Sequence, residues 1–333
     1  MKLALFFTFR VSLKEWLDKG LFDREKLLYE KLLRGEILSN VLWLTYGPKD
    51  GKIAAELKQA GRLNKDIEIL PMPAVFNFPL GKFIYSLMMP AIMKKYLKQT
   101  DIYKTNQMSG SWSAVLTKKI FKKPLIVRTG YTWSRLKESQ KISSAKKTFI
   151  RAVERFAYKN SDYAIVTTKS QAEYIKTNYA VSDKDAFIIP NYIDTDLFKP
   201  DSSAEKYPDR LIFVGRISNE KNLINLVTAV AKAEMCLDIY GSGDIDGLNE
   251  HIRKTGAKIN FKGSVANELL PDILNKYKFF ALPSFAESLP KSLLEALACG
   301  LICIGTDVTG INEVITGGVN GWLAKSTDAD SIF

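Results

Sequence analysis

The stretch that decides the fold is FFALPSFAESLPKSLLEALACG, residues 279–300. Its first part, FFALPS, is an apolar run typical of a buried strand, and SLLEALA repeats apolar residues at helical spacing until Gly300. Pro290 suits the first position of that helix. The stretch therefore predicts a strand that turns directly into a helix, with free backbone N–H groups at the helix start.

Two glutamates flank this predicted helix start. Glu287 lies in the turn, and Glu295 lies within the apolar part of the helix. Helix N-termini attract phosphate, carboxylates accept hydrogen bonds from sugar hydroxyls, and open parallel sheets bind ligands at the carboxyl ends of their strands. A lone glutamate is more often a solvated helix residue. The positions of these two favour a nucleotide-sugar site.

A second stretch, LIFVGRISNEKN (residues 211–222), predicts a strand that ends at Gly215, a loop with Arg216 and Lys221, and a helix from Asn222. Arginine can contact phosphate oxygens with two N–H groups, and lysine can approach them as a point charge. Together the two cations could neutralise a diphosphate leaving group without a metal ion. The alternative is a pair of exposed surface cations.

The order of these motifs resembles that of the retaining glycosyltransferases of family 4, the group 1 type. The motifs are VGRISNEKN, LDIYGSGD, FKGSV, LPSFAESLPKSLLEALACG and TGINEVITGGVNGW, between Leu211 and Ala324. The resemblance implies an α/β protein with a GT-B fold, in which two Rossmann-like domains with parallel sheets face a central cleft. We expect an acceptor-binding domain at 1–198, a linker at 199–210 and a nucleotide-sugar-binding domain at 211–333, truncated at its C-terminal helices.

The resemblance also implies roles for individual residues. Arg216 and Lys221 would bind the donor diphosphate, Glu295 would accept hydrogen bonds from the ribose, and Glu287 would face the transferred sugar. The binding residues implied besides these are Gly215, Leu289, Pro290, Lys291 and Ser292 at the phosphates, and Gly263, Ser264 and Val265 at the nucleobase.

The expected reaction is transfer of a sugar, of the hexosyltransferase type, from a UDP or GDP sugar with retained configuration. No cofactor or metal ion is expected. Positive charge develops on the anomeric carbon and negative charge on the leaving phosphate, so fixed cations and carboxylates lower the barrier. The triplets Asp194-Thr-Asp196, Asp244-Ile-Asp246 and Asp328-Ala-Asp330 could be an acidic metal motif, but such triplets arise easily by chance.

The chain departs from the family in its histidines. Family members commonly place a histidine in the first domain near the transferred sugar, whereas the one histidine here is His251, in a predicted helix of the second domain and expected to be exposed. Asn106 or Arg128 would take that position, and we favour Arg128. Because a guanidinium cannot act as a base, Arg128 would help electrostatically. A catalytically silent nucleotide-sugar binder therefore stays open as an alternative.

Charge is distributed unevenly along the chain. Residues 1–150 hold 28 Lys and Arg against 12 Asp and Glu, and residues 151–333 hold 20 against 24. The lysines that accompany apolar neighbours are Lys94, Lys95, Lys98, Lys118, Lys119, Lys122, Lys123, Lys146 and Lys147. Such segments favour binding to an anionic membrane surface, with a glycan or lipid-linked acceptor. A basic nucleic-acid-binding protein is the other alternative, but no nucleic-acid motif accompanies the charge, so no nucleic acid is expected.

Several features bear on the compartment. No apolar run is long enough to span a membrane, and MKLALFFTF reads as a first strand rather than a signal peptide. Cys236, Cys299 and Cys303 lie in or beside apolar runs without a disulfide spacing. We expect a cytoplasmic protein, peripheral at the inner face of the membrane, in polysaccharide or lipopolysaccharide biosynthesis.

The first domain alternates predicted strands and helices, which indicates a parallel sheet. The best-defined helix is predicted from Ser12 to Arg34, because Ser12 and Glu15 form a capping box and Gly35 can end it.

Overall fold

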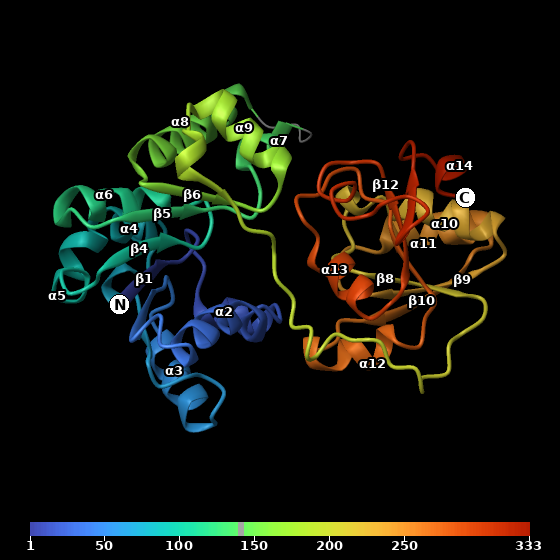
Figure 1. The fold of residues 1–333 in the computed structure, drawn as a ribbon, viewed down its shortest axis with the longest axis horizontal. Coiled ribbons are helices and arrows are strands. Elements are labelled where there is room, and N and C mark those ends of the chain that lie inside the picture. The colour runs from blue at the N-terminus through green and yellow to red at the C-terminus, as the bar shows by residue number, and fades with distance from the viewer. Residues whose placement is uncertain (139–142) are drawn as a thin grey trace. The chain divides into compact units, whose positions relative to one another are not determined.

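The computed structural model describes residues 1–138 and 143–333. By its internal contacts the chain forms two compact units. The first unit comprises Met1–Thr167 and Gln171–Ile189, and the second comprises Thr168–Ser170 and Pro190–Phe333 (Figure 1). Each unit contains one parallel sheet with helices packed on it. The expected pair of parallel α/β sheets is confirmed.

The sheet of the first unit has seven strands in the order β3-β2-β1-β4-β5-β6-β7, all paired in parallel. The strands are β1 (Lys2–Phe6), β2 (Asn40–Leu44), β3 (Ile67–Leu70), β4 (Ile102–Thr105), β5 (Leu125–Arg128), β6 (Tyr163–Val166) and β7 (Ala186–Ile188). The strand order changes direction after β3, because β4 pairs with the other edge of β1. Right-handed crossovers then place the helices before and after that point on opposite faces.

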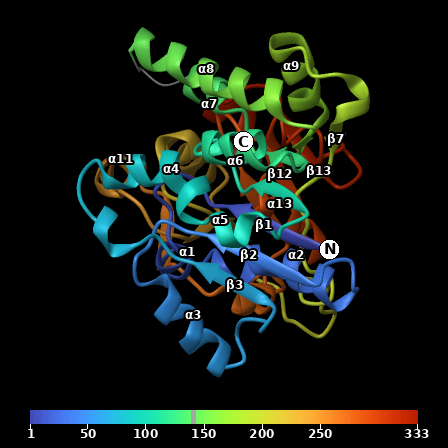
Figure 2. The same ribbon diagram turned by 90° about the vertical axis from the view of Figure 1, so that its left-hand side faces the viewer.

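The helices of the first unit form two layers. One layer contains α1 (Leu13–Asp18), α2 (Phe22–Arg34) and α3 (Asp50–Gln59). The other contains α4 (Gly81–Ile92), α5 (Lys94–Leu97), α6 (Ser111–Phe121) and α8 (Ser144–Asn160); α4 contacts α5 and α6, and α6 contacts α8. Figure 2 shows α3 on one side of the strands and α6 with α8 on the other. The remaining elements are η1 (Ala74–Phe76), α7 (Trp133–Glu138), α9 (Lys169–Tyr179) and η2 (Asp183–Asp185).

The predicted first helix is in fact two helices. Ser12 does cap α1, because its side chain accepts a hydrogen bond from the Glu15 N–H at 3.0 Å. The helix then breaks at Gly20, which has a left-handed φ of 63°, and the chain restarts at Phe22. Glycine adopts this conformation at little cost. The prediction of a single helix from Ser12 to Arg34 was therefore wrong, although α2 does end before Gly35 as expected.

The core of the first unit is rich in aromatic rings. Phe7 stacks on Trp16 with ring centroids 4.1 Å apart, and Trp43 contacts both rings edge-on or at a tilt. All three side chains are buried. The short helix α1 is thus fixed to the sheet by Trp16, which explains why a six-residue helix is stable at this place.

The sheet of the second unit has six parallel strands in the order β10-β9-β8-β11-β12-β13. The strands are β8 (Arg210–Val214), β9 (Cys236–Tyr240), β10 (Lys258–Gly263), β11 (Phe279–Leu282), β12 (Ile302–Thr306) and β13 (Gly321–Ala324). The helices are η3 (Asn219–Lys221), α10 (Leu223–Lys232), α11 (Asp246–Thr255), η4 (Asn267–Leu269), α12 (Leu270–Leu274), α13 (Lys291–Ala298) and α14 (Ala329–Ile332). The order reverses between β8 and β11, which is a topological switch point.

The boundary between the units lies earlier than the predicted boundary at 198/199. Phe198 is buried in the hydrophobic core of the second unit. The segment predicted as a linker is also bonded to that unit, since the Asp201 N–H donates to Asn275 Oδ1 at 2.8 Å and the Tyr207 N–H donates to the Lys276 carbonyl at 2.9 Å. Residues 190–210 therefore pack with the second unit because they have apolar and hydrogen-bonding partners there.

A buried polar network ties three strands of the second unit together. Asp238 on β9 accepts hydrogen bonds from Tyr277 Oη and from Asn260 Nδ2, both at 2.6 Å, and pairs with Arg210 at 3.3 Å. Burial disfavours the charge of Asp238, but the hydrogen bonds from Tyr277 and Asn260 outweigh this and hold the pKa of the carboxyl below its ordinary value. The network therefore depends on an ionised Asp238.

The three cysteines Cys236, Cys299 and Cys303 are free and buried, as expected. Across the described residues, no helix combines the length and the apolar character that crossing a membrane requires.

Candidate functional site

The candidate site lies at the carboxyl ends of β8 and β11, the two neighbouring strands at the switch point of the second sheet. The loop after β8 carries Gly215, Arg216 and Lys221, and the loop after β11 carries Glu287. Both stretches quoted from the sequence therefore end at the same edge of the same sheet, because parallel strands present their carboxyl ends together.

Backbone and side-chain hydrogen bonds join the two loops. The Phe285 N–H donates to the Glu220 carbonyl at 2.9 Å. Asn222, which is buried and has a left-handed φ of 56°, donates through Nδ2 to the Pro283 carbonyl at 2.9 Å and to the Thr327 carbonyl at 2.7 Å. Asparagine tolerates this backbone conformation better than most residues. Asn222 thus fixes the loop that carries Lys221 to the loop that carries Glu287.

The two loops also bring together one predicted cation and one predicted carboxylate. Lys221 Nζ forms an ion pair with Glu287 Oε1, and the same oxygen accepts a hydrogen bond from Ser284 Oγ at 2.8 Å. The side chains of Lys221 and Glu287 are only 16% and 13% exposed. Removing one partner of such a buried pair would leave the other charge without compensation. Ser284 lies three residues before Glu287, a spacing at which a hydroxyl can reach the carboxylate, and sequence reasoning missed it.

Gly215 has a steric reason to be glycine. A Cβ atom at this position would lie 3.1 Å from the Phe213 ring and 3.8 Å from Cε of Lys221. The missing side chain avoids a tight contact with the Phe213 ring, whereas the distance to Lys221 is an ordinary contact distance. Arg216 follows directly and is exposed, so its guanidinium remains accessible at the same edge.

Glu295 lies on α13 and is 3% exposed. Its Oε1 accepts a hydrogen bond from Asn267 Nδ2 at 3.4 Å. Asn267 begins η4, two residues after the stretch 263–265 that was predicted at the nucleobase. The residue predicted at the ribose is thereby joined to the loop predicted at the base, and Asn267 is a further candidate that the sequence did not single out.

Burial, and next the Glu295 carboxylate, raise the pKa of the Cys299 thiol to about 11.

The helix predicted to begin at Pro290 begins one residue later. Pro290 is the N-cap of α13, and its extended backbone carries no side-chain cap. The prediction that Pro290 occupies the first helical position was wrong, because its ψ of 119° lies outside the helical region. The Pro290 side chain makes no cap bond at the amino end of α13, where Lys291 and Ser292 lie, and backbone N–H groups at a helix start can bind phosphate.

Two contacts hold the segment before α13 in place. Asn191 Nδ2 donates to the Leu289 carbonyl at 2.7 Å. Gly310, with φ of 86°, packs so closely on the loop that a Cβ atom there would lie 1.8 Å from the Ser288 carbonyl oxygen. Gly310 of the TGINEV motif therefore lets its backbone pack directly against the turn between Glu287 and α13.

The first unit holds the remaining predicted candidate, Arg128, at the end of β5. Its backbone is bonded to Thr105, whose Oγ1 donates to the Arg128 carbonyl at 3.1 Å and accepts from the Arg128 N–H at 3.0 Å. Asn106, the other residue considered there, is buried and lies 3.5 Å from Thr8 Oγ1. Both therefore lie at the carboxyl edge of the first sheet.

Lys104 is a titratable group of the first unit that sequence reasoning missed. It is buried on β4, and its Nζ donates to Tyr29 Oη at 2.9 Å. Burial, and next the nearby Arg128 cation, lower the pKa of Lys104 to about 7. Nothing in the sequence pattern indicated this, because the residue lies in the ordinary alternation of a strand.

His251 is only partly exposed, and the expectation of an exposed residue was wrong. The ring lies 2.8 Å from Thr228 Oγ1, on the neighbouring helix α10. His251 is a residue of α11, and it contacts α10, the helix that packs against α11. It is thus explained as a helix-packing residue of the second unit.

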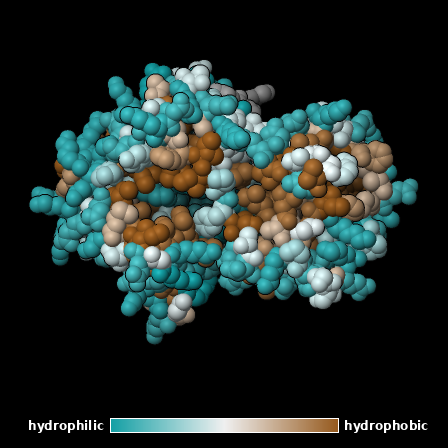
Figure 3. Space-filling model, viewed as in Figure 1, coloured by the Kyte–Doolittle hydropathy of each residue, from teal (hydrophilic) through white to brown (hydrophobic). Residues whose placement is uncertain are grey.

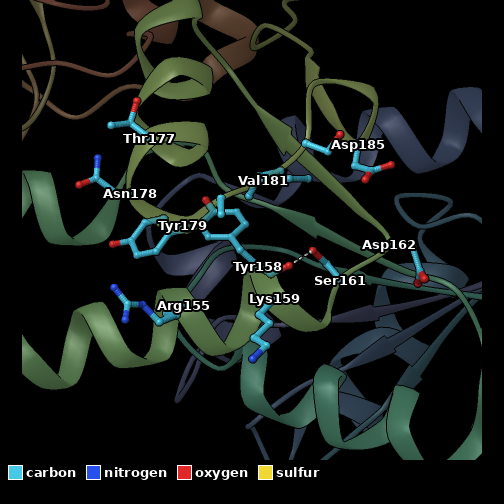
Figure 4. Close-up of a pocket in the computed structure, with 13 residues that line it drawn as sticks. Arg155, Tyr158, Lys159, Ser161, Asp162, Thr177, Asn178, Tyr179, Val181 and Asp185 are labelled. Carbon is cyan, nitrogen blue, oxygen red and sulfur yellow. Dashed lines mark hydrogen bonds between the residues drawn. The ribbon is translucent and has the colours of Figure 1, made fainter.

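Two cavities lie outside the residues predicted for the site. In the second unit, a cavity of about 560 Å³ borders the loop after β8 and includes Phe285. In the first unit, a cavity of about 530 Å³ is lined by residues of α8, β6 and α9 (Figure 4). The latter includes Asp162 and Ala164 at the amino end of β6, which is the edge opposite to the one where parallel sheets bind ligands.

Among residues 1–138 and 143–333, no group of three or more His, Cys, Asp or Glu side chains could hold a metal ion.

Two family models match this chain. The model for glycosyl transferases group 1 matches residues 194–333, and the model for glycosyltransferase family 4 matches residues 41–197. An uncharacterised glycosyltransferase of Methanocaldococcus jannaschii is 25% identical over 289 residues, which are 79% of this chain and 69% of that protein. An α-1,3-galactosyltransferase of Escherichia coli, which acts between UDP-Gal and α-D-GlcNAc-diphosphoundecaprenol, is 24% identical over 77% of this chain and 70% of its own length. Several other curated relatives match over only a third to a half of their length.

Solved structures resemble the fold. The Anabaena protein HepE in complex with UDP has a TM-score of 0.73 and 16% identity, over 100% of this chain and 88% of that chain. The two matched models together run from residue 41 to residue 333, and the group 1 model covers the loops after β8 and β11 of the second sheet. The chain therefore belongs to glycosyltransferase family 4: it is a glycosyltransferase with a GT-B fold that takes a nucleotide-sugar donor.

Proposed function

We propose that this glycosyltransferase moves a hexosyl group from a UDP or GDP sugar, with retained configuration and without a metal ion, to a glycan or lipid-linked acceptor. UDP is the form that we favour, because the Anabaena HepE structure contains UDP and the E. coli relative uses UDP-Gal. The acceptor class follows the same relative, whose acceptor is a sugar carried on diphosphoundecaprenol. The proposed setting is polysaccharide or lipopolysaccharide synthesis at the inner face of the membrane.

The observation that carries the proposal is the joining of the Lys221 loop to the Glu287 loop. Lys221 and Glu287, which are 66 residues apart in the chain, share a mostly buried ion pair. A cation and a carboxylate therefore lie at one strand edge, close in sequence to the start of α13. A nucleotide sugar carries anionic phosphates beside a neutral polyol, and these are the two chemistries that such a pair can serve.

In the proposed mechanism Lys221 and Arg216 stabilise the negative charge that grows on the departing diphosphate. The N–H groups of Lys291 and Ser292 contact the same phosphates, Leu289 and Pro290 shape the turn, and Gly215 precedes Arg216 at the end of β8. Glu295, held by Asn267, accepts hydrogen bonds from the ribose, and the backbone of Gly263, Ser264 and Val265 lies against the base. Lys221 is held by Glu287 before the reaction, so this cation needs little reorganisation as charge develops.

Glu287 has a separate role in this mechanism. Ser284 and Lys221 orient its carboxylate, so one oxygen is already occupied by two donors. The other oxygen can accept a hydrogen bond from a hydroxyl of the transferred sugar or interact with the positive charge at the anomeric carbon. Arg128 of the first unit would supply a further positive charge. Because a guanidinium stays protonated, it would act electrostatically and would not move a proton.

Donor choice is tested directly by thermal-shift measurements with UDP, GDP and ADP and their sugars on the full chain. We expect UDP to raise the melting temperature most, because bound ligand stabilises in proportion to its affinity. Sugar release is then measured in EDTA with the donor that binds, in the presence of a lipid-diphosphate acceptor. Loss of turnover in EDTA would refute the metal-independent reaction.

Binding and chemistry are separated by a second readout. If UDP binds but neither hydrolysis nor transfer to any lipid or glycan acceptor occurs, the silent-binder alternative replaces the proposed reaction. If a short oligonucleotide stabilises the chain and no nucleotide diphosphate does, the donor assignment is refuted. Glu287→Gln should retain most of the UDP affinity while losing turnover, because it is assigned to the sugar and not to the nucleotide.

A further inference from the structure

Helix α4 in the first unit has an apolar face that stays largely exposed among the residues that the structure describes. The exposed fractions are 45% for Phe83, 38% for Ile84, 45% for Leu87 and 46% for Met88. These positions recur at helical spacing, whereas Tyr85, Ser86 and Met89 on the opposite side are buried. In the segment before the helix, Val75, Phe78 and Leu80 are also exposed. An exposed apolar surface of this extent marks an interaction site rather than scattered surface residues.

The helices next to this apolar face carry one sign of charge. Helices α4, α5, α6 and α8 hold ten basic residues and one acidic residue, Glu154, which is buried. The basic residues are Lys82, Lys94, Lys95, Lys118, Lys119, Lys146, Lys147, Arg151, Arg155 and Lys159. Residues 69–100, which include the apolar face, contain four lysines and no acidic residue. Cations and exposed apolar side chains therefore share one helix layer.

The opposite layer of the same unit provides an internal control. Helices α1, α2 and α3 contain seven basic and seven acidic residues. The basic residues are Lys14, Arg24, Lys26, Lys31, Arg34, Lys52 and Lys58, and the acidic residues are Glu15, Asp18, Asp23, Glu25, Glu30, Asp50 and Glu56. Many of them pair with each other, as Lys14 does with Asp18 and Lys26 with Asp23. One sheet thus has a balanced layer on one face and a basic, partly apolar layer on the other.

The basic layer also contains a hollow lined with lysines. A cavity of about 290 Å³ at the end of α6 is lined by Lys118, Lys119, Lys122 and Lys123, together with Pro124, Asn160 and Asp162. Lys118 pairs with Asp162 at 2.6 Å, and Lys119 lies over the Phe156 ring. Four cations against one carboxylate leave a net positive hollow, which suits a phosphate group. Ile120, beside it, is 59% exposed.

We infer that the α4–α5–α6–α8 layer is a docking surface for an anionic lipid bilayer. The apolar face of α4 and residues 75–80 enter the interface between headgroups and acyl chains, and the lysines of α5 and α6 bind lipid phosphates. On the face drawn in Figure 3, apolar residues in brown interrupt the polar surface of the first unit in several places. An interfacial helix combines these two features, namely a broad apolar face and flanking lysines.

The charge pattern favours a bilayer over the other candidate occupants. A second copy of this chain would bring the same basic layer against itself, so like charges would repel. Single-stranded nucleic acid stacks its bases on aromatic rings, whereas the α4 face has Ile84, Leu87 and Met88 beside one ring, Phe83. A bilayer accepts both aliphatic side chains and cations. The inference rests on the membrane-borne acceptor proposed above and specifies the surface that meets the membrane.

The test measures binding of the full chain to vesicles by co-sedimentation, with and without phosphatidylglycerol in phosphatidylcholine, over a series of salt concentrations. Binding should require phosphatidylglycerol. Lys94→Gln with Lys95→Gln should weaken it about 30-fold at low salt, because each lysine near a charged surface contributes about 1 kcal/mol. Leu87→Gln with Met88→Gln should remove the part of the binding that persists at high salt, since that part is apolar.

The matched control is Lys52→Gln with Lys58→Gln on α3, which removes the same charge from the opposite layer. This variant should bind vesicles within about twofold of the unaltered chain. Equal weakening by the α3 and α5 variants, or equal binding to vesicles without phosphatidylglycerol, would overturn the inference. So would displacement of the chain from vesicles by a short oligonucleotide, or a dimer in light scattering that Leu87→Gln with Met88→Gln dissociates.

UDP binding by the same variants distinguishes this inference from the proposed function. The α4 and α5 variants should bind UDP as the unaltered chain does, which also shows that they are folded. If UDP binds and vesicles do not, the docking surface is wrong and the donor site stands. If vesicles bind and UDP does not, the docking surface stands and the proposed donor is wrong.

Discussion

The two units use the same architecture, a parallel sheet between helices, but they carry their chemistry in different places. In the second unit the polar residues converge at one strand edge, where Asn222, Lys221 and Glu287 link two loops. In the first unit the distinctive charges lie elsewhere, on one helix layer and on a buried lysine of β4. The difference shows that a site formed by loops can be recognised in the sequence by closely spaced motif residues. A docking surface on helices can be recognised only by an excess of lysine and exposed apolar residues.

The largest effect is expected from Lys221→Ala, which tests whether the loop junction of the second unit is catalytic. Turnover should fall by two or more orders of magnitude, because a preorganised cation near a developing negative charge contributes about 3 kcal/mol or more. Steady-state kinetics with the donor identified by thermal shift measure the effect. Lys254→Ala removes another lysine that pairs with a glutamate in the same unit, but both partners are exposed, and it should leave turnover within about twofold. Equal losses in the two variants would show that Lys221 acts through stability alone.

The loop junction also shows what the sequence could predict. The strand, turn and helix around Glu287 were predictable because apolar spacing, Pro290 and Gly300 each mark a boundary. That Lys221 would pair with Glu287, rather than both facing solvent, was not predictable, since it depends on Asn222 and on the Phe285 backbone bond. Side-chain partners supplied from far along the chain, such as Asn267 for Glu295, carry no local signal.

The first unit shows the limits of the same reasoning more clearly. A capping box correctly marked the start of α1, but periodicity carried the helix through Gly20, where the backbone is left-handed. The first domain was predicted to end at Phe198, whereas Phe198 packs in the core of the second unit. The helix break and the unit boundary both depend on contacts between residues far apart in the chain, and local sequence patterns do not predict such contacts.

The next largest effect is expected from Asp238→Asn in the second unit. The change should reduce the local stability of β9 by about 2 kcal/mol at neutral pH, because Arg210 loses its charge partner and one buried hydrogen bond loses its acceptor. Hydrogen exchange of peptides containing residues 236–240, followed by mass spectrometry, measures it. The exchange of residues 102–105 in the first unit should not change. A similar increase in both units would indicate global unfolding and would contradict a local network.

The pH dependence of the Asp238 effect has a definite sign. The pKa of Asp238 is held below its ordinary value of 3.8 in the folded protein, so the carboxylate contributes stability above that value. The contribution should disappear as the pH falls through the folded pKa. The difference between Asp238→Asn and the unaltered chain should therefore shrink below about pH 4 and stay constant near neutrality. A difference that grows on acidification would refute this assignment.

Lys104→Met tests the corresponding buried charge in the first unit, and the opposite pH dependence is expected. The pKa of Lys104 is lowered to about 7, below its ordinary value of 10.5, so the folded state binds fewer protons than the unfolded state between these values. Stability should therefore rise with pH in that window, by up to about 1.4 kcal/mol per pH unit from this group. The variant should lose this slope and be relatively more stable below pH 7. Protection of β4 in hydrogen exchange between pH 6 and 9, corrected for intrinsic rates, gives the slope, and an unchanged slope would contradict the shift.

The smallest effect on stability is expected from breaking the exposed ion pair of Lys254 with Glu250 on α11. It is the reference for the effect of breaking the mostly buried pair of Lys221 with Glu287. Both side chains are more than half exposed, at 69% and 61%, and they lie one helical turn apart. Water and salt screen such a pair, so Glu250→Gln should change stability by about 0.3–0.5 kcal/mol. Urea unfolding in low and high salt measures this. Lys221 and Glu287 have the same chemical groups but are mostly buried, and so Glu287→Gln should cost clearly more. Equal losses of stability in Glu287→Gln and Glu250→Gln would mean that burial of the Lys221–Glu287 pair has no energetic consequence. The loop junction would then be no different from an exposed surface ion pair of the same unit.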